Sequence, residues 1–372
     1  MPFPGSQVED TIDLAYFLHS NIIWIRILGF FLLAYPAYWF VTKGKDVYKW
    51  TAIFLLAFWL LVVYAFNFRF LAEKMFYQPE NIILLKSDAN KIPDLNLVIG
   101  VSLNGEARAY PIEIIGYHHQ VRDTLAGQPI MVTYCTVCRT GRVFKPEVGG
   151  VAENFRLVGM DHFNAMFEDS RTKSWWRQAN GEAIAGPLKG ETLLEIPSEQ
   201  MTLASWLQRY PESFILQPDS LFKKQYAGLE KYDEGKAEGA LEGTDSLSWK
   251  DKSWVVGVQT GTITRAYDWN DLKTYRVIND DVDGIPIIVA LENDTASFHV
   301  WNRVVGSDTL QFHYNPSLKL IVDTNTQSIW DWTGKCIEGT YKDATLSSMQ
   351  SYQEFWHSWK TFHPTTTQYF PK

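Results

Sequence analysis

The chain has 372 residues, more than one domain of typical size needs, so we expect more than one folded unit. Hydrophobic residues make up 46% and charged residues 20%, a composition typical of globular proteins rather than disordered ones. The formal net charge of −8 excludes the basic surface that nucleic-acid binding requires.

The N-terminal region holds two apolar segments, residues 22–41 and 50–68. Each approaches the roughly 20 residues that a membrane-spanning helix needs. Neither is followed by the small-residue site of a cleaved signal peptide, and aromatic residues gather toward the segment ends, as in an interfacial belt. We therefore expect residues 1–69 to form a transmembrane hairpin, with the lipid bilayer as partner, rather than a buried helical hairpin of a soluble protein.

The charges around these segments predict an orientation. The loop between them carries Lys43, Lys45 and Lys49, whereas the N-terminal tail carries acidic residues and no Lys or Arg. Positively charged loops stay in the cytoplasm, so we expect the tail and all residues after 69 to lie outside it.

The remaining chain divides by composition into four parts. Residues 70–96 have little periodicity and are expected to form a connecting arm. A first module over 97–217 is separated from a second over 247–372 by a polar, charged stretch at 218–246, which we expect to be a linker outside the core.

The two modules repeat the same residues in the same order, which predicts a tandem duplication. Arg108, Ala109 and Tyr110 return as Arg265, Ala266 and Tyr267, and further matches pair Gly100 with Gly257, Asp169 with Asp323, Thr172 with Thr326, Ser174 with Ser328, Trp176 with Trp330, Gly186 with Gly339, Trp206 with Trp359 and Pro211 with Pro364. Residues kept in both copies are expected to serve the shared fold. Residues present in one copy are candidates for a function of that copy alone.

Most local signals within each module are typical of β-structure. Residues 97–103 and 106–110 flank Asn104-Gly105, the pair that favours a tight hairpin turn. Short β-branched runs follow at 129–134 and 142–144.

Helices are fewer. We expect one at 199–209 and a matching one at 352–362, where Ser351 and Glu354 have the spacing of a capping box. The predicted fold class is α+β and β-rich: a tandem duplicated module preceded by a two-helix transmembrane hairpin.

Three chemically active residues occur in the first module only. His118, Cys135 and Cys138 align with Tyr275, Glu292 and Thr295 of the second. Their joint absence favours a functional site in the first module, because a purely structural set would more often be kept in both copies.

The Cys135–Cys138 pair permits a redox dithiol, half of a metal site or a local disulfide. Arg139 stands where a c-type haem site requires His, so no haem is expected. Gly141 and β-forming residues follow the pair, unlike the helix that follows the thioredoxin pair. We therefore expect a strand–turn–strand knuckle.

A set of two cysteines and one histidine suits zinc or copper(I). The candidate metal ligands are His118, Cys135 and Cys138, with His119, His162 or Met160 as a fourth ligand or with an open fourth position. A hydrogen-bonded structural histidine and an inert cysteine pair are the competing interpretation. Cys336 aligns with Ala183 and is expected to be a buried hydrophobic residue. No phosphate-binding glycine loop is present, so no nucleotide is expected.

The chain after its N-terminal helices resembles a known family. The runs Val132-Thr133-Tyr134-Cys135-Thr136-Val137-Cys138 and Gly181-Glu182-Ala183-Ile184-Ala185-Gly186-Pro187-Leu188 together resemble the bacterial domain-of-unknown-function family numbered thirty-one seventy-nine. The resemblance covers about residues 90–372 and implies that His118, Cys135 and Cys138 are signature residues. It implies no activity. The chain departs from the family pattern near Asp161-His162, where a Tyr-Asn pair is expected.

Three functions remain open from the sequence. The first is a membrane-anchored protein of the bacterial cytoplasmic membrane, with its modules outside the cytoplasm and a Cys/Cys/His metal site. The second is a thiol–disulfide oxidoreductase that uses Cys135 and Cys138 as catalytic residues. The third is a non-catalytic binding or scaffold protein.

Overall fold

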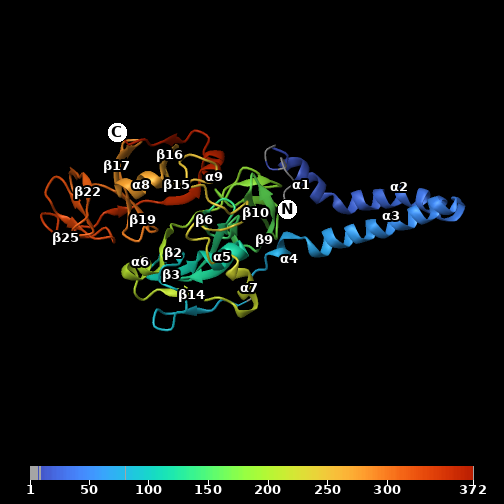
Figure 1. Ribbon diagram of the computed structural model, residues 1–372, viewed down its shortest axis with the longest axis horizontal. Coiled ribbons are helices and arrows are strands. Elements are labelled where there is room, and N and C mark those ends of the chain that lie inside the picture. Colours follow the sequence, from blue (N-terminus) through green and yellow to red (C-terminus); the bar gives the residue numbers. More distant parts are fainter. Residues whose placement is uncertain (1–6, 8–9, 80, 372) are drawn as a thin grey trace.

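The computed structural model describes residues 7, 10–79 and 81–371. A long helical hairpin projects from a β-rich body (Figure 1). Helix α1 (Ile12–Ser20) leads into α2 (Ile22–Lys43), and α3 (Asp46–Tyr64) continues as the π-helix η1 (Ala65–Arg69).

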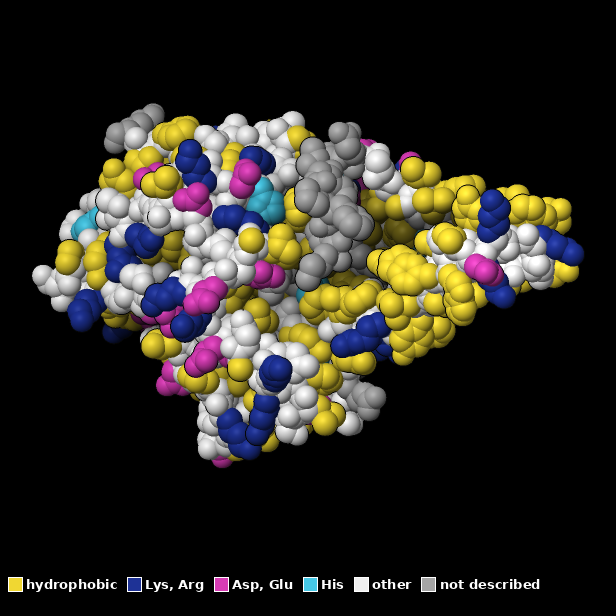
Figure 2. Space-filling view, turned by 45° about the vertical axis from the view of Figure 1, so that its right-hand side comes forward, with side chains coloured by type: hydrophobic (Ala, Val, Ile, Leu, Met, Phe, Trp, Pro, Cys, Tyr) yellow, Lys and Arg dark blue, Asp and Glu magenta, His cyan; other side chains and the backbone are white. Residues whose placement is uncertain are grey.

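The two long helices have the properties of membrane spans. Ile22–Lys43 and Asp46–Arg69 are long and apolar enough to cross a membrane, and their side chains are not buried by protein. Hydrophobic side chains cover most of this hairpin, whereas the body shows mixed charges (Figure 2). The expectation of two apolar N-terminal helices is confirmed.

The first half of the body begins with a five-stranded sheet in the order β1-β14-β3-β2-β13. The hairpin of β2 (Leu97–Leu103) and β3 (Glu106–Pro111) turns at Asn104 and Gly105, whose φ angles of 49° and 86° are those of the predicted tight turn. The other strands are β1 (Leu84–Leu85), β13 (Glu199–Thr202) and β14 (Phe214–Leu216).

Two further sheets complete this half. One contains β4 (Gln120–Leu125), β5 (Gln128–Cys135) and β6 (Thr140–Phe144), and the other contains β9 (Phe155–Asp161), β10 (Asn164–Asp169), β11 (Trp175–Arg177) and β12 (Ala183–Ala185). The helices are α4 (Ala72–Met75), α5 (Ile112–His118), α6 (Leu203–Arg209) and α7 (Lys223–Ala227), with a 3₁₀ turn at Ser220–Phe222 and the short pair β7 (Glu147–Val148) and β8 (Val151–Ala152).

The second half contains three four-stranded sheets and one short pair. Their strands are β15 (Trp254–Thr260), β16 (Ile263–Asp268), β27 (Ser351–Phe355) and β28 (Thr367–Gln368); β17 (Val277–Val282), β18 (Ile285–Leu291), β19 (Phe298–Asn302) and β26 (Ser347–Ser348); β22 (Phe312–Asn315), β23 (Leu320–Asp323), β24 (Ile329–Trp330) and β25 (Cys336–Glu338); and β20 (Val304–Val305) with β21 (Asp308–Thr309). Helices α8 (Trp269–Tyr275) and α9 (Trp356–Phe362) join them. The β-rich α+β class is confirmed.

The predicted helices at 199–209 and 352–362 form only in part, because the first residues of each range belong to a strand. Glu199–Thr202 forms strand β13, because its backbone pairs with Leu97–Gly100 of β2, and only Leu203–Arg209 is helical. Ser351–Phe355 is likewise strand β27, paired with β15. Sheet pairing therefore overrides local helix propensity at both places.

The capping box at Ser351 and Glu354 does not form, since both residues belong to β27. Helix α9 begins after Phe355, which makes no side-chain cap, whereas in the matching helix α6 the Thr202 side chain accepts a hydrogen bond from the Ser205 N–H.

Residues matched between the halves make the same contacts in both. Asp123 accepts hydrogen bonds from Arg108 and Tyr110, and Asp280 accepts them from Arg265 and Tyr267. Each aspartate thereby ties the central hairpin of its half to the next strand. These three matched residues serve the fold.

Two further matched sets pack alike. The carboxylates of Asp169 and Asp323 accept hydrogen bonds from the Thr, Ser and Trp residues that follow each. Gly100 and Gly257 lie against Trp206 and Trp359, where an added Cβ would come within 2.2 Å and 2.3 Å of an indole carbon. The shared residues are therefore packing and turn determinants.

The stretch at 218–246 contributes residues to the core of the first half. Tyr226 and Tyr232 are buried in the main hydrophobic core of the first half. The Asp233 carboxylate accepts a hydrogen bond from the Leu97 N–H at 2.8 Å. The expectation that this stretch lies outside the core is therefore wrong for these residues, since its two tyrosines supply apolar area that a polar composition does not reveal.

Candidate functional site: the cysteine turn

The two cysteines lie on a tight turn between β5 and β6, which confirms the predicted strand–turn–strand knuckle. Cys135 ends β5, Thr140 begins β6, and residues 136–139 form the turn. The Cys138 N–H donates to the Cys135 carbonyl oxygen at 3.2 Å. Arg139 adopts a left-handed φ of 56°, which reverses the chain direction.

Both thiols are free and fully buried. The Cys135 thiol lies 3.5 Å from the Phe163 carbonyl oxygen, to which it donates, and the neighbouring Cys138 thiol is the main cause that lowers the pKa of Cys135. Burial raises the pKa of Cys138. The two thiols therefore titrate as a pair in which Cys135 ionises first and Cys138 keeps its proton.

The second half of the chain covers this turn. The Phe355 N–H donates to the Cys138 carbonyl oxygen at 3.0 Å, and His357 Nε2 donates to the Val137 carbonyl oxygen at 3.1 Å. Lys252 Nζ donates to the same Val137 oxygen at 2.6 Å. Lys252 also lies near both thiols, where its positive charge favours a thiolate.

Two buried arginines fix the turn to the second half. Arg139 Nε donates to Gln353 Oε1 at 2.8 Å, and its guanidinium lies 3.6 Å from the centre of the Trp254 ring. Arg142 donates to Glu354 Oε1 at 2.5 Å and stacks on Tyr352. Both cations are thus paired or stacked, as buried charges must be.

His118 serves the core rather than the cysteine turn. Its Nε2 lies 2.7 Å from the Tyr226 hydroxyl, and its Nδ1 hydrogen bonds to the Tyr77 carbonyl oxygen. Both ring nitrogens therefore have partners. Burial lowers the pKa of His118, which keeps the imidazole neutral.

The other histidines near the site are also engaged. His119 lies in the left-handed region at φ 62°, and its Nδ1 is 3.2 Å from the Tyr117 carbonyl oxygen. Burial lowers the pKa of His119 to about 4. His162 Nδ1 lies 2.7 Å from Asp161 Oδ1.

No three His, Cys, Asp or Glu side chains form a metal-holding group within residues 7, 10–79 and 81–371. The structure thus brings Cys135 and Cys138 together but does not assemble them with His118. Met160, on β9, lies in the wall of a neighbouring cavity. Cys336 is buried in a hydrophobic cluster of the second half, as predicted.

The matching turn of the second half shows what replaces the thiols. Glu292 accepts a hydrogen bond from His299 at 2.7 Å and another from Ser205 of α6. The Thr202 N–H donates to Ser297 Oγ at 2.9 Å. Each half therefore covers the turn of the other, but in the second turn a hydrogen-bonded Glu292–His299 pair stands where the first turn has thiols.

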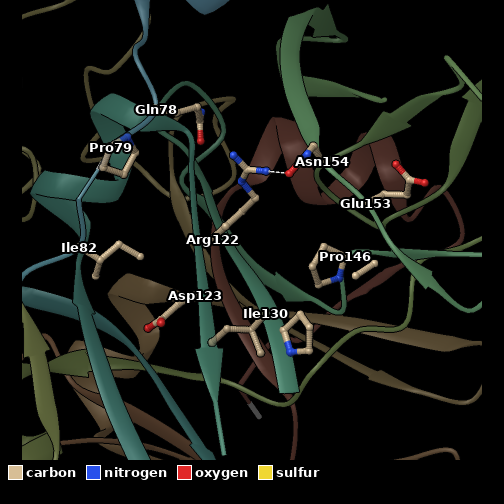
Figure 3. Close-up of a pocket in the computed structure, with 11 residues that line it drawn as sticks. Gln78, Pro79, Ile82, Arg122, Asp123, Ile130, Pro146, Glu153 and Asn154 are labelled. Carbon is tan, nitrogen blue, oxygen red and sulfur yellow. Dashed lines mark hydrogen bonds between the residues drawn. The ribbon is translucent and has the colours of Figure 1, made fainter. Parts of the chain in front are cut away.

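Two of the cavities in the described part of the chain lie in the first half near this site. The larger, of about 770 Å³, has an apolar wall and includes Thr136 and Val137 of the cysteine turn. The smaller, of about 370 Å³, is shown in Figure 3. There Arg122 hydrogen bonds to Asn154, and Asp123 already binds Arg108 and Tyr110. Its polar groups are thus satisfied by the fold.

Several residues that lie around the cysteines could not be predicted from the sequence. Lys252, His357 and Ser358 lie more than a hundred positions from the turn along the chain. No local motif marks them. The one indication was that Ser358 matches Ser205 of the first half. The Ser358 hydroxyl hydrogen bonds to Thr140 next to the cysteine turn, and the Ser205 hydroxyl hydrogen bonds to Glu292 of the matching turn.

Comparison with known proteins gives one match. A family model described as "Protein of unknown function (DUF3179)" matches residues 81–366. No curated protein and no solved structure matches the chain at a significant level. Because the matched region contains the cysteine turn and the segments that cover it and spans most of the sequence, the chain belongs to the DUF3179 family.

Proposed function

We propose that the chain is a membrane-anchored thiol–disulfide oxidoreductase whose redox pair is Cys135 and Cys138. The observation that carries this proposal is the placement of two free, buried thiols on one tight turn, where their pKa values are shifted in opposite directions. A dithiol of this kind provides an attacking thiolate and a protonated resolving thiol in one turn.

The proposed chemistry is a two-electron step. Oxidation forms the Cys135–Cys138 sulfur–sulfur bond, breaks both S–H bonds, and passes two electrons and two protons to an acceptor. Cys135, the thiol that ionises first, attacks. Cys138 then resolves the intermediate and closes the disulfide.

The location of the reaction is part of the proposal. The apolar helices α2 and α3 would anchor the protein in the bacterial cytoplasmic membrane, with Lys43, Lys45 and Lys49 of their connection facing the cytoplasm. The body would then lie outside the cytoplasm, where disulfides persist.

We further propose that the two halves are copies of one ancestral module. The matched contacts of Asp123 and Asp280, and of Trp206 and Trp359, support this view. In this account the second copy has lost its thiols and acts as the cover of the first copy's turn.

A redox titration tests the function. The full chain in detergent is equilibrated in dithiothreitol buffers of defined potential, and free thiols are alkylated and counted by intact mass. We expect a reversible two-electron transition at about −120 to −270 mV, the range of catalytic dithiols. Cys336 stays reduced throughout and serves as an internal control.

Two results would overturn the proposal. A transition below about −300 mV, or none, would make the pair structural. Stoichiometric zinc or copper that is lost in the Cys135→Ser/Cys138→Ser variant would instead establish the pair as a metal site.

A further inference from the structure

The cavity of about 770 Å³ lies between the base of the helical hairpin and the cysteine turn. One wall comes from Phe70, Met75 and Phe76, which directly follow the second apolar helix. If that helix spans the bilayer, these residues lie at the membrane surface. The cavity would then open where a membrane-soluble molecule can enter from the lipid.

The opposite wall of the cavity lies directly in front of the thiols. Val137 of the turn and Ala165 of β10 line this wall. Both residues pack with Cys135 in one buried hydrophobic cluster. One layer of residues therefore separates the cavity from the thiol that ionises first.

A single histidine supplies a proton-accepting group in the cavity wall. His119 lines the cavity, and its ring lies 4.4 Å from the ring of Phe76. Its Nδ1 donates to the Tyr117 carbonyl oxygen, which leaves Nε2 as the acceptor nitrogen of a neutral imidazole.

The charges at the cavity limit the kind of ligand. Glu238 and Glu242 are its charged lining residues, and both are acidic. A fatty acid or anionic lipid would place like charges together there. A neutral head group on an apolar tail fits the mainly apolar wall better.

The burial of the thiols limits which kinds of redox partner can react with them. Both cysteine side chains are inaccessible from outside, so a disulfide carried on another folded protein cannot reach them in this conformation. A small, flat two-electron acceptor can approach through the cavity after a local movement of Val137.

We infer that this cavity binds a membrane-soluble quinone, which accepts the electrons of Cys135 and Cys138. The inference rests on the proposed oxidoreductase function. The dithiol and the quinone give the disulfide and the quinol: two S–H bonds break, one S–S bond forms, and two O–H bonds form on the quinone oxygens. His119 Nε2 relays one of the two protons.

Binding of a decyl-substituted benzoquinone to the full chain in nanodiscs tests the inference. We expect quenching of tryptophan fluorescence that saturates, and a Kd at least about ten-fold higher for Met160→Trp, which fills the cavity. Leu241→Trp, at its partly exposed rim, is a second blocking variant. Leu194→Trp adds the same ring at an exposed site outside the cavity and should bind normally.

The Cys135→Ser/Cys138→Ser variant separates this inference from the proposed function. It should bind the quinone but transfer no electrons, whereas the wild type should form its disulfide and one quinol per pair. Absent binding, or equal binding by both blocking variants and the wild type, overturns the quinone site, while the redox titration above still decides the oxidoreductase. Tighter binding of decanoate than of the quinone would also overturn it.

Discussion

At the scale of single residues, the two cysteines are made unequal by their neighbours. The neighbouring Cys138 thiol lowers the pKa of Cys135, whereas burial raises the pKa of Cys138. This inequality is the chemical basis for assigning attack to Cys135 and resolution to Cys138.

Replacing Cys138 tests that inequality. In Cys138→Ser the hydroxyl still donates to the Cys135 thiolate, but in Cys138→Ala the donor is lost, so the pKa of Cys135 should be higher in the alanine variant. We expect the pH midpoint of Cys135 alkylation by iodoacetamide, followed by mass spectrometry, to be higher for alanine than for serine. Equal midpoints would mean that the hydrogen bond does not stabilise the thiolate.

Asp233 predicts a dependence of stability on pH. Burial raises its pKa to about 7, and its Oδ1 atom is buried without a hydrogen-bond partner in the described part of the chain. The protonated form is therefore favoured in the folded state. The resulting stabilisation is complete below the ordinary carboxyl pKa near 4 and is lost as the pH rises toward 7, by about 1.4 kcal/mol for each unit of pKa difference.

The variant Asp233→Asn keeps the acceptor for the Leu97 N–H but cannot ionise. Relative to this variant, the wild type should lose unfolding free energy between about pH 4 and pH 7 and then level off. Urea denaturation at several pH values measures the difference. A difference that does not change with pH would contradict the raised pKa.

The sequence identified the two cysteines, but it could not show which distant residues lie beside them in the folded chain. The comparison between modules identified Cys135 and Cys138, because their matched positions hold Glu292 and Thr295. It also selected His118, whose ring nitrogens contact Tyr77 and Tyr226. Joint absence from one copy does not reveal which side chains meet in space.

At the scale of secondary-structure elements, pairing between distant strands determines whether a segment becomes a strand or a helix when its local propensity does not. Residues 199–202 have the composition of a helix start, yet they pair with β2 as strand β13. The hairpin at 97–111 was predictable because Asn104 and Gly105 form the turn from two adjacent residues. Long-range pairing has no such local signature.

The close contact of Gly100 with Trp206 gives a prediction for this element. An added Cβ would overlap the indole, so Gly100→Ala should lower the free energy of unfolding by about 1–3 kcal/mol or more. Gly159→Ala is the matched control, because its Cβ would lie at an ordinary 3.6 Å from Met166. Similar losses in both variants, measured by urea denaturation, would contradict the packing account.

At the scale of the whole molecule, each half covers a turn of the other half. Helix α9 and its preceding residue cover the cysteine turn, α6 and Thr202 cover the matching turn, and Gln200 meets its matched residue Gln353 at 2.9 Å. The second half is therefore a structural component of the site. The sequence indicated two similar modules but not this arrangement, because no interface residue is marked by a motif.

The buried pair of Arg142 and Glu354 tests how strongly the halves depend on each other. Glu354→Ala removes the closer carboxylate partner of the buried Arg142 and leaves only Glu195, at 3.7 Å, so it should cost up to about 3–5 kcal/mol of unfolding free energy. It should also speed alkylation of Cys138, whose carbonyl oxygen is bound by the next residue, Phe355.

An exposed ion pair provides the control for that variant. Asp343→Ala removes the partner of Lys335 and should cost less than about 1 kcal/mol without changing thiol reactivity. Slow Cys138 alkylation in Glu354→Ala despite lost stability would show that the second half does not control access to the turn.

The most direct test of the central claim is the redox state of Cys135 and Cys138 in native membranes. Membranes containing the full chain are quenched with acid and alkylated, and the two cysteines are quantified by mass spectrometry before and after a pulse of oxidant or reductant. The account predicts a mixture of dithiol and disulfide that shifts reversibly with each pulse, while Cys336 stays reduced. A pair that remains fully reduced, or fully oxidised, through both pulses would contradict it.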